Sequence, residues 1–284
     1  MKVLVTGASG FVGQHVIPQL LERGHTVIAV ARDESKARSF PWFKHVRFIA
    51  SDIHLPINNP VELFEQPEAA IHLAWPGLPN YKDLFHFEEN LPADYRFLKA
   101  LVEGGIGHLL ITGTCFEYGM QSGCLTEEMP TQPTNPYGLA KDTLRKFLQS
   151  LQLRRAFTLQ WARLFYMYGQ GQNSNSLLAQ LDRAIVCKSR VASFNMSSGA
   201  QLRDYLPVAE VARRLVTLLE HPECDGVVNV SSGEPISVRS LVEEYLVKCG
   251  ADIHLNRGYY PCPDYEPMAF WGGSKIFKRN GDLS

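Results

Sequence analysis

The chain has 284 residues, of which 45% are hydrophobic, so it can bury one large core with or without a small appended lobe. Its formal net charge of −1 and sequence pI near 6.8 give no electrostatic footprint for nucleic acid or an anionic membrane, and neither partner is expected. Six cysteines without a CxxC pair indicate scattered thiols in a reducing compartment and argue against a disulfide framework or a zinc site, so no metal is expected either.

The N-terminal residues predict a strand, a tight turn, a helix and a second strand. A β-branched and aliphatic run at 2–6 is followed by a glycine turn at 7–13, an amphipathic stretch at 14–22 and a second apolar run at 26–30. Because the first strand begins at residue 2 and no apolar run reaches membrane-spanning length, we expect a soluble, cytoplasmic protein without a signal peptide.

The glycine turn is a candidate site for the pyrophosphate of a dinucleotide. Glycine lets the backbone approach a phosphate, and the helix that follows directs N–H groups and a partial positive charge at it. The spacing here is GxxGxxG, whereas the common fingerprint is GxGxxG, and a turn without a ligand would need glycine too. The second strand directly after the helix favours the dinucleotide, with contacts expected from Gly7, Gly10, Phe11 and Val12.

The end of the second strand favours NADP over NAD. An NAD site places a carboxylate there for the ribose 2′-OH, whereas an NADP site places a cation for the 2′-phosphate. Ala31 occupies the position of the acid, and Arg32 follows it with a planar guanidinium that suits a phosphate. The alternative is that Arg32, Lys36 and Arg38 form only a solvated loop face.

Further strands and helices alternate up to about residue 165, which predicts an α/β fold with a doubly wound parallel sheet. Strands are expected at 46–50, 69–75, 109–112 and 158–162, and helices at 90–103 and 136–151. Ligands bind beyond the carboxyl ends of such strands. Cofactor contacts are therefore expected also from Asp52, Ile53, Leu73, Ala74, Trp75 and Leu164.

The alternation weakens in the last part of the chain. We expect residues 1–165 to form the dinucleotide-binding domain, with return segments near 203–232, for example a strand at 226–230. Residues 166–284 are expected to form mainly a smaller, mixed, substrate-binding lobe.

Tyr137 and Lys141 are a candidate pair for proton transfer. They are four residues apart on a predicted helix, so both side chains lie on one face. An ammonium beside a phenol favours the phenolate and lowers its pKa toward the working pH, as a general acid or base requires. Thr114, at a strand end, can hydrogen-bond the same substrate oxygen. A YxxxK spacing alone is common by chance, but here it follows the threonine and the glycine turn in order.

Several ordered motifs extend this pattern along nearly the whole chain. Besides the glycines, they are His72-Leu73-Ala74, Asn90, Thr114 with Tyr118-Gly119, Asn135-Pro136-Tyr137 with Lys141, Arg163 with Tyr168-Gly169, Arg203-Asp204-Tyr205-Leu206-Pro207-Val208, and Asn229-Val230-Ser231-Ser232-Gly233-Glu234-Pro235. Together they resemble the extended branch of the short-chain dehydrogenase/reductase superfamily, which has a Rossmann fold and acts mainly on nucleotide-diphosphate sugars.

The resemblance implies roles for particular residues. Thr114, Tyr137 and Lys141 would be the catalytic set, and Arg203 would clamp the diphosphate, although a structural ion pair with Asp204 or a neighbour is the alternative. It also implies substrate contacts and a homodimer in which the helices at 90–103 and 136–151 form a four-helix bundle. The substrate contacts would be Thr114, Cys115, Phe116, Tyr166, Asn175 and Arg203.

Departures from the family pattern favour some of the family's reactions over others. Cys115-Phe116 replace the Asp-Glu pair of 4,6-dehydratases, which argues against elimination of water. Tyr166 stands where epimerases commonly have Asn, and Arg32 also favours a reductase. Trp75 replaces a small residue and forms either an apolar wall near the sugar or part of the core.

The sequence thus favours an NADPH-dependent reductase of a 4-keto-6-deoxy nucleotide sugar. As the resemblance implies, the pro-S hydride goes to C4, Tyr137 protonates the oxygen, Lys141 lowers the Tyr137 pKa and binds the nicotinamide ribose, and Thr114 orients the carbonyl. The first alternative is a nucleotide-sugar 4-epimerase that retains NAD. A non-catalytic NADP sensor or scaffold is the second, and the intact Thr114, Tyr137 and Lys141 argue against it.

Overall fold

The core of the fold is a seven-stranded, fully parallel sheet in the order β11-β7-β5-β4-β1-β2-β3. The computed structural model describes residues 1–186, 193–277 and 282–283, so Cys187 lies outside the described residues. The strands are β1 (Lys2–Thr6), β2 (Thr26–Ala31), β3 (Arg47–Ala50), β4 (Ala69–His72), β5 (His108–Thr114), β7 (Thr158–Leu164) and β11 (Gly226–Val230). The strand order reverses between β1 and β4, where a crevice opens at the carboxyl ends.

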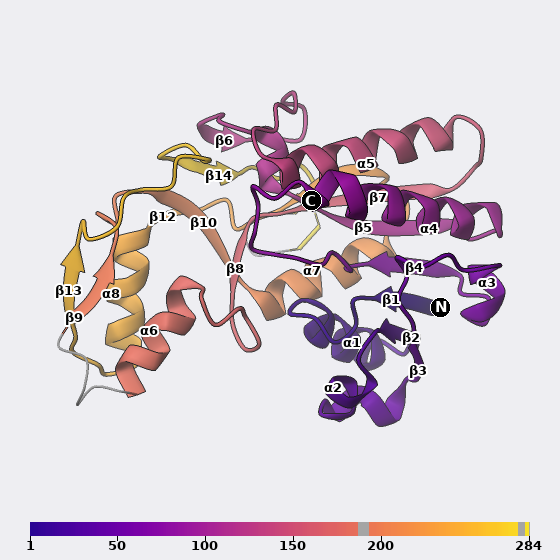
Figure 1. Cartoon of the computed structure of the whole chain (residues 1–284), viewed down its shortest axis with the longest axis horizontal. Helices are drawn as coiled ribbons and strands as arrows, with labels where there is room; N and C mark the ends of the chain where they lie inside the picture. Colours follow the sequence, from indigo (N-terminus) through magenta and orange to yellow (C-terminus); the bar gives the residue numbers. More distant parts are fainter. Residues whose placement is uncertain (187–192, 278–281, 284) are drawn as a thin grey trace.

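Helices cover both faces of this sheet (Figure 1). On one face, α1 and α7 pack on an apolar core that includes Val16, Ile17 and Leu215, and on the other face α4 and α5 pack on a second core that includes Leu98 and Leu144. The helices are α1 (Gly13–Glu22), α2 (Glu34–Arg38), α3 (Pro60–Leu63), α4 (Leu91–Glu103), α5 (Pro136–Gln152), α6 (Leu177–Val186), α7 (Val208–Glu220) and α8 (Val238–Lys248). Short helical turns are η1 (Pro41–His45), η2 (His86–Asn90) and η3 (Cys115–Tyr118).

Three smaller sheets are formed mainly by the second half of the chain, with β6 from the first half. They are β12 (Pro235–Ser237), β10 (Leu202–Pro207) and β8 (Tyr166–Tyr168); β13 (His254–Arg257) and β9 (Ser193–Met196); and β14 (Phe270–Gly272) and β6 (Gly123–Leu125). Helices α6 and α8 share a separate apolar core with β9. In Figure 1 these elements stand to the left of the large sheet, and β8 and β10 lead from one to the other.

The predicted α/β fold with a doubly wound parallel sheet is confirmed, and three smaller sheets accompany the large one. The strand expected at 226–230 is β11, which pairs with β7 at the edge of the large sheet. Among the residues that the structure describes, no helix is long and apolar enough to span a membrane.

Several strand ends differ from the prediction, and two of these differences concern the site. The strand expected at 69–75 ends at His72, because the chain then passes directly over Gly7: a Cβ on Gly7 would lie 2.8 Å from the Ala74 nitrogen. The strand expected to end at Thr112 continues to Thr114, since its pairing with β7 extends that far. Thr114 is therefore the last residue of a buried strand.

Candidate active site

A cleft of about 1080 Å³ lies at the carboxyl ends of the central strands. It brings together all of the predicted site residues except Arg203. Those that line it are Gly7, Gly10, Phe11, Val12, Arg32, Asp52, Ile53, Leu73, Ala74, Trp75, Thr114, Cys115, Phe116, Tyr137, Lys141, Leu164, Tyr166 and Asn175.

The glycine turn fits a dinucleotide because it has no room for side chains. Gly7 has a φ of +68°, a conformation that favours glycine. The backbone of Leu73 and Ala74, just after β4, occupies the space where a Cβ of residue 7 would lie. A Cβ on Gly13 would lie 2.4 Å from the Gly7 carbonyl oxygen, so α1 can begin directly behind the turn. The turn thus presents bare backbone and a helix N-terminus to the cleft, which are the features that hold a pyrophosphate.

The end of the cleft beside β2, where the sequence predicts the adenosine of the dinucleotide, carries both cations and carboxylates. Arg32 and Lys36 line it and are exposed. The Asp33 carboxylate lies there too, but it caps α2 by accepting hydrogen bonds from the Lys36 nitrogen at 3.0 Å and the Ser35 hydroxyl at 2.6 Å. Asp52 accepts from the His54 nitrogen at 3.0 Å. Both carboxylates are thus already held by local hydrogen bonds.

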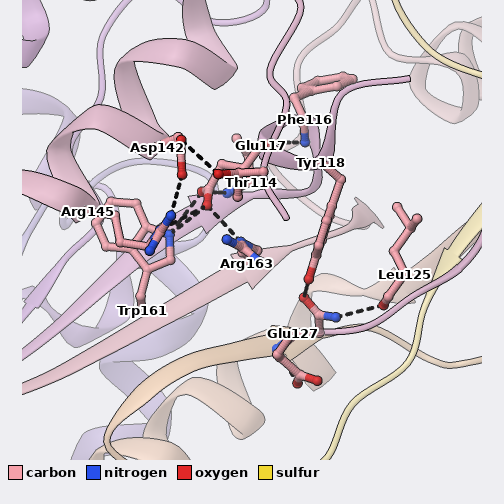
Figure 2. Close-up of polar contacts among 12 residues, drawn as sticks. Thr114, Phe116, Glu117, Tyr118, Leu125, Glu127, Asp142, Arg145, Trp161 and Arg163 are labelled. Carbon is pink, nitrogen blue, oxygen red and sulfur yellow. Dashed lines mark hydrogen bonds and ion pairs between the residues drawn. The ribbon is translucent and has the colours of Figure 1, made fainter. Parts of the chain in front are cut away.

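Thr114 is held in place by the buried carboxylate of Glu117 (Figure 2). The Thr114 nitrogen donates to Glu117 Oε1 at 2.9 Å, and the Thr114 hydroxyl caps η3 by accepting from the Phe116 nitrogen at 3.3 Å. Glu117 also accepts from the Trp161 indole at 2.9 Å and from Arg163 Nε at 2.7 Å. The position of the threonine therefore depends on a buried ionic network.

Tyr137 and Lys141 lie on the first turns of α5. Asn135 caps this helix by accepting from the Gly138 nitrogen at 2.8 Å, and Pro136 follows at its first position. The Tyr137 nitrogen donates to the Tyr81 carbonyl at 3.2 Å. Lys141 Nζ donates to the Thr112 carbonyl at 2.9 Å. The helix start thus places the phenol and the ammonium beside the end of β5.

Burial dominates the protonation of both groups. It raises the pKa of Tyr137 well above its usual value, with further contributions from Tyr81 and Glu117, while a hydrogen bond with Thr114 acts in the opposite direction. Burial also lowers the pKa of Lys141 to about 8. In this arrangement burial outweighs the other influences on the Tyr137 pKa, and a lowering of that pKa by Lys141 stays a prediction.

Aromatic rings surround the Tyr137 phenol. The ring centroids of Trp75, Tyr81 and Phe116 lie 6.0, 5.7 and 6.3 Å from that of Tyr137. Tyr265 packs on Tyr81 and Phe116 and also lines the cleft. The reacting end of the cleft is therefore largely apolar.

Arg203 does not line the cleft itself; its guanidinium lies over the ring of Tyr166, which does. Its side chain is buried and forms an ion pair with Glu266 at 2.7 Å. The Asp204 carboxylate instead accepts from the Ser232 nitrogen and hydroxyl at 2.6 and 2.7 Å. The ion-pair alternative from the sequence is thus present in the structure with Glu266 as the partner, and a diphosphate contact by Arg203 stays a prediction.

Sequence reasoning missed several residues of the site. Tyr81, Tyr265 and Glu266 come from distant segments with no local pattern that points to them. Glu117 had a signal, since a threonine followed three residues later by glutamate is the spacing of a capping box.

Comparisons with known proteins agree with this geometry. The family model of the NAD-dependent epimerase/dehydratase family matches residues 3–231. A dTDP-6-deoxy-L-talose 4-dehydrogenase (NAD(+)) from Aggregatibacter actinomycetemcomitans is 30% identical over 96% of this chain and 99% of its own length. A UDP-glucose 4-epimerase from Halalkalibacterium halodurans is 27% identical over 86% of this chain and 79% of its own length.

A solved structure shares the fold. The structure described as MoeE5 in complex with UDP-glucose and NAD superimposes with a TM-score of 0.83 at 24% identity, over 100% of this chain and 94% of that one. The resemblance to extended short-chain dehydrogenases/reductases is thereby confirmed. The chain belongs to the NAD-dependent epimerase/dehydratase family.

Proposed function

We propose that the protein reduces the keto group at C4 of a 4-keto-6-deoxy nucleotide-diphosphate sugar, using NADPH. The observation that carries this proposal is the convergence of Thr114, Tyr137 and Lys141 on one cleft with the glycine turn. A relative whose name specifies a 4-dehydrogenase of a dTDP-6-deoxy sugar supports it. We assign residues 1–165 and the return segments near 203–232 mainly to cofactor binding, and the rest of 166–284 mainly to the substrate.

The protonation of the site suits a reduction. The Tyr137 phenol carries its proton at neutral pH and can give it to the oxygen that forms at C4, although burial, which raises its pKa, makes it a weaker acid. The Thr114 hydroxyl orients the carbonyl, and Lys141 supplies a positive charge behind the phenol while it is protonated. The nicotinamide supplies the hydride when it is bound. The residues that would hold the cofactor are Gly7, Gly10, Phe11, Val12, Arg32, Asp52, Ile53, Leu73, Ala74, Trp75, Tyr137, Lys141 and Leu164.

The apolar wall supports a 6-deoxy sugar. Tyr81, Phe116 and Tyr166 present rings to the cleft, and burial keeps the neighbouring Cys115 thiol neutral by raising its pKa. A methyl group at C6 can pack on such a surface, whereas a hydroxyl or carboxylate there would lose water without gaining a partner. Together with Thr114, we propose Cys115, Phe116, Tyr166, Asn175 and Arg203 as the substrate contacts.

The preference for NADP rests on the cations at the adenosine end. Arg32 and Lys36 line the cleft, and the nearby Asp33 carboxylate is engaged in capping α2. A 2′-phosphate would find two positive charges there. The competing observation is that the talose dehydrogenase is named for NAD(+).

A 4-epimerase is the second candidate, because UDP-glucose 4-epimerases are among the relatives. An epimerase returns the hydride to the same sugar and needs no exchange of cofactor. The two functions therefore differ in whether NAD(P)H is consumed in step with the sugar.

We also propose a homodimer in which α4 and α5 form a four-helix bundle. Leu139 and Phe147 on α5 are 46% and 44% exposed, and Phe147 packs edge-on against Tyr95 of α4. Apolar side chains on the outer face of two adjacent helices are typical of a surface that a second copy covers.

The decisive experiment incubates the purified protein with a 4-keto-6-deoxy nucleotide sugar and either NADPH or NADH. We expect one cofactor to be oxidised for each sugar reduced. Tyr137→Phe should abolish turnover while dinucleotide binding persists, and Tyr95→Phe, outside the cleft, should change neither. Conversion between two 4-hydroxy sugars without net cofactor oxidation would establish the epimerase, and full activity of Tyr137→Phe would refute the proposed chemistry.

A further inference from the structure

Trp75 lies directly beside the ammonium of Lys141. The indole ring centroid is 4.0 Å from Lys141 Nζ, close enough for a cation–π interaction. Trp75 follows the end of β4, is partly buried and lines the cleft. It therefore covers one side of the ammonium, while the Thr112 carbonyl accepts a hydrogen bond from the same group at 2.9 Å.

The indole is itself fixed from behind by His86. Trp75 Nε1 donates to His86 Nδ1 at 3.0 Å, and the two rings are stacked at 18° with centroids 6.2 Å apart. His86 Nε2 lies 3.0 Å from the Asn80 carbonyl oxygen. Because an indole nitrogen can only donate and a carbonyl can only accept, Nδ1 must be the bare nitrogen and Nε2 must carry the proton.

This hydrogen bonding requires a neutral His86. The side chain is fully buried but does not line the cleft, and burial lowers its pKa. A neutral ring adds no repulsion to the ammonium nearby. The backbone at Asn80, the imidazole and the indole thus form one rigid support that ends at Lys141.

Other groups also act on the charge of Lys141. Asp94 on α4 and Glu117 in η3 favour the ammonium, whereas burial favours the neutral amine. Tyr137, on the same helix, stays protonated and contributes no charge at neutral pH. The indole face contacts the ammonium directly and can be replaced without altering a charge.

We propose that Trp75, held by His86, is a positioning residue for Lys141: it keeps the ammonium charged and directed at the end of β5, and so sets the upper pH limit of turnover. In this role both residues act through Lys141; Trp75 is also among the residues that we propose hold the cofactor, whereas His86 does not line the cleft. The role also explains why a large ring can stand where the family pattern has a small residue. The part of the proposal that concerns turnover rests on the proposed function, whereas the contact between indole and ammonium does not.

The first test follows the indole N–H signals of the full chain by proton–nitrogen correlation NMR across pH. The chain has only 4 tryptophans, so the Trp75 signal can be assigned from its loss in Trp75→Leu. We expect this signal to shift with a midpoint near pH 8, where Lys141 loses its proton, and to stay constant in Lys141→Met. A Trp75 signal that does not titrate in the unaltered protein would overturn the proposal, whatever the enzyme's substrate.

The second test compares the pH dependence of kcat among matched variants. Trp75→Leu keeps apolar bulk but removes the ring face, and His86→Leu removes the support without touching the cleft. In both, we expect the midpoint at which kcat falls on the basic side of its pH profile to move down by about one pH unit, which means a roughly fivefold loss of kcat at the pH of the old midpoint. His86→Gln should restore most of it, since its amide can accept from the indole and donate to Asn80.

Trp42→Phe is the control for a general loss of packing, because Trp42 is buried in the core on the α1 face. It should lower the melting temperature and leave unchanged the pH at which kcat falls on the basic side of its profile. If Trp75→Leu and His86→Leu behave in the same way as Trp42→Phe, both residues are only structural and the proposal is wrong.

Discussion

Arg203 and Glu266 form a buried ion pair, with Arg203 Nη2 at 2.7 Å from Glu266 Oε1. The guanidinium also donates to the carbonyls of Leu202 at 2.8 Å and Met268 at 3.1 Å. Glu266 in turn accepts from the Tyr166 hydroxyl, and Tyr166 lines the cleft. A cation that the sequence suggests for a substrate diphosphate is thus held by an acid of the chain itself.

Replacing this acid should free Arg203. Glu266→Gln keeps the shape and removes the negative charge, so we expect the KM for the nucleotide sugar to fall about fivefold, or ~1 kcal/mol. The variant should also be less stable by about 1–3 kcal/mol, because Arg203 loses its buried counter-charge. Steady-state kinetics and thermal unfolding measure the two effects. An unchanged KM alongside the stability loss would mean that Arg203 has only a structural role.

The choice of cofactor should depend on Arg32. Arg32→Ala removes the exposed guanidinium at the adenosine end, so we expect the KM for NADPH to rise about 10-fold or more while that for NADH changes little. Competition between the two cofactors for the emptied protein checks this. Arg38→Ala is the matched control, since Arg38 pairs with Glu34 on α2. Equal effects on NADH and NADPH would remove the argument for NADP.

Lys141 should make the protein less stable at neutral pH. Its pKa is about 8 in the folded chain and 10.5 as the ordinary value, so the unfolded chain binds more protons between these pH values and stability rises with pH across them. Below about pH 8 the folded chain bears the full free-energy cost of burying the Lys141 ammonium. We therefore expect Lys141→Met to be inactive but about 1–2 kcal/mol more stable than the unaltered protein at pH 7.

This advantage of Lys141→Met should shrink as the pH approaches 10. Urea unfolding at several pH values provides the comparison. A variant that is less stable at pH 7 would show that the contacts of the ammonium with Thr112 and Trp75 outweigh its desolvation.

Glu117 should matter for both folding and turnover. Glu117→Gln leaves Arg163, which is 2% exposed, without a buried counter-charge, and we expect a loss of about 3–5 kcal/mol. Turnover of the folded fraction should fall as well, because one amide oxygen cannot accept from Thr114, Trp161 and Arg163 together and the Thr114 backbone is held less firmly. Glu243→Gln breaks an exposed pair with Arg239 and should cost less than about 0.5 kcal/mol. An unchanged kcat in the folded Glu117→Gln variant would show that the ionic network around Glu117 is not needed for turnover.

The predictions from sequence succeeded where the signal is local. The glycine turn, the strand before it and the helix after it are adjacent in the chain, and Tyr137 and Lys141 share a helix face at a fixed spacing. The protonation of the site was not predictable in this way. Whether a phenol is acidified by a lysine depends on how deeply both are buried, and the spacing of two residues carries no information on burial.

The support behind the site was not predictable for a related reason. Glu266 reaches Arg203, and Glu117 reaches Arg163, only after separate segments have packed together. Trp75 and His86 are closer in sequence, but the loop between them has no periodicity that would indicate a contact. Such pairs are set by tertiary packing, which a single sequence does not display.

The parallel pairing of β14 with β6 has a consequence for how the protein folds. Phe270 pairs with Gly123 and Trp271 with Cys124, so the loop that follows Thr114 is fixed by a strand made much later in the chain (Figure 1). Strands β1, β2 and β4, beside which we propose that the dinucleotide binds, are all made early. During synthesis on the ribosome, the glycine turn and strands β1, β2 and β4 therefore emerge well before β14, the strand that fixes this loop. The pairing of β14 with β6 is a long-range contact of the kind that slows folding, and the segment after Thr114 gains this support only once β14 has been made.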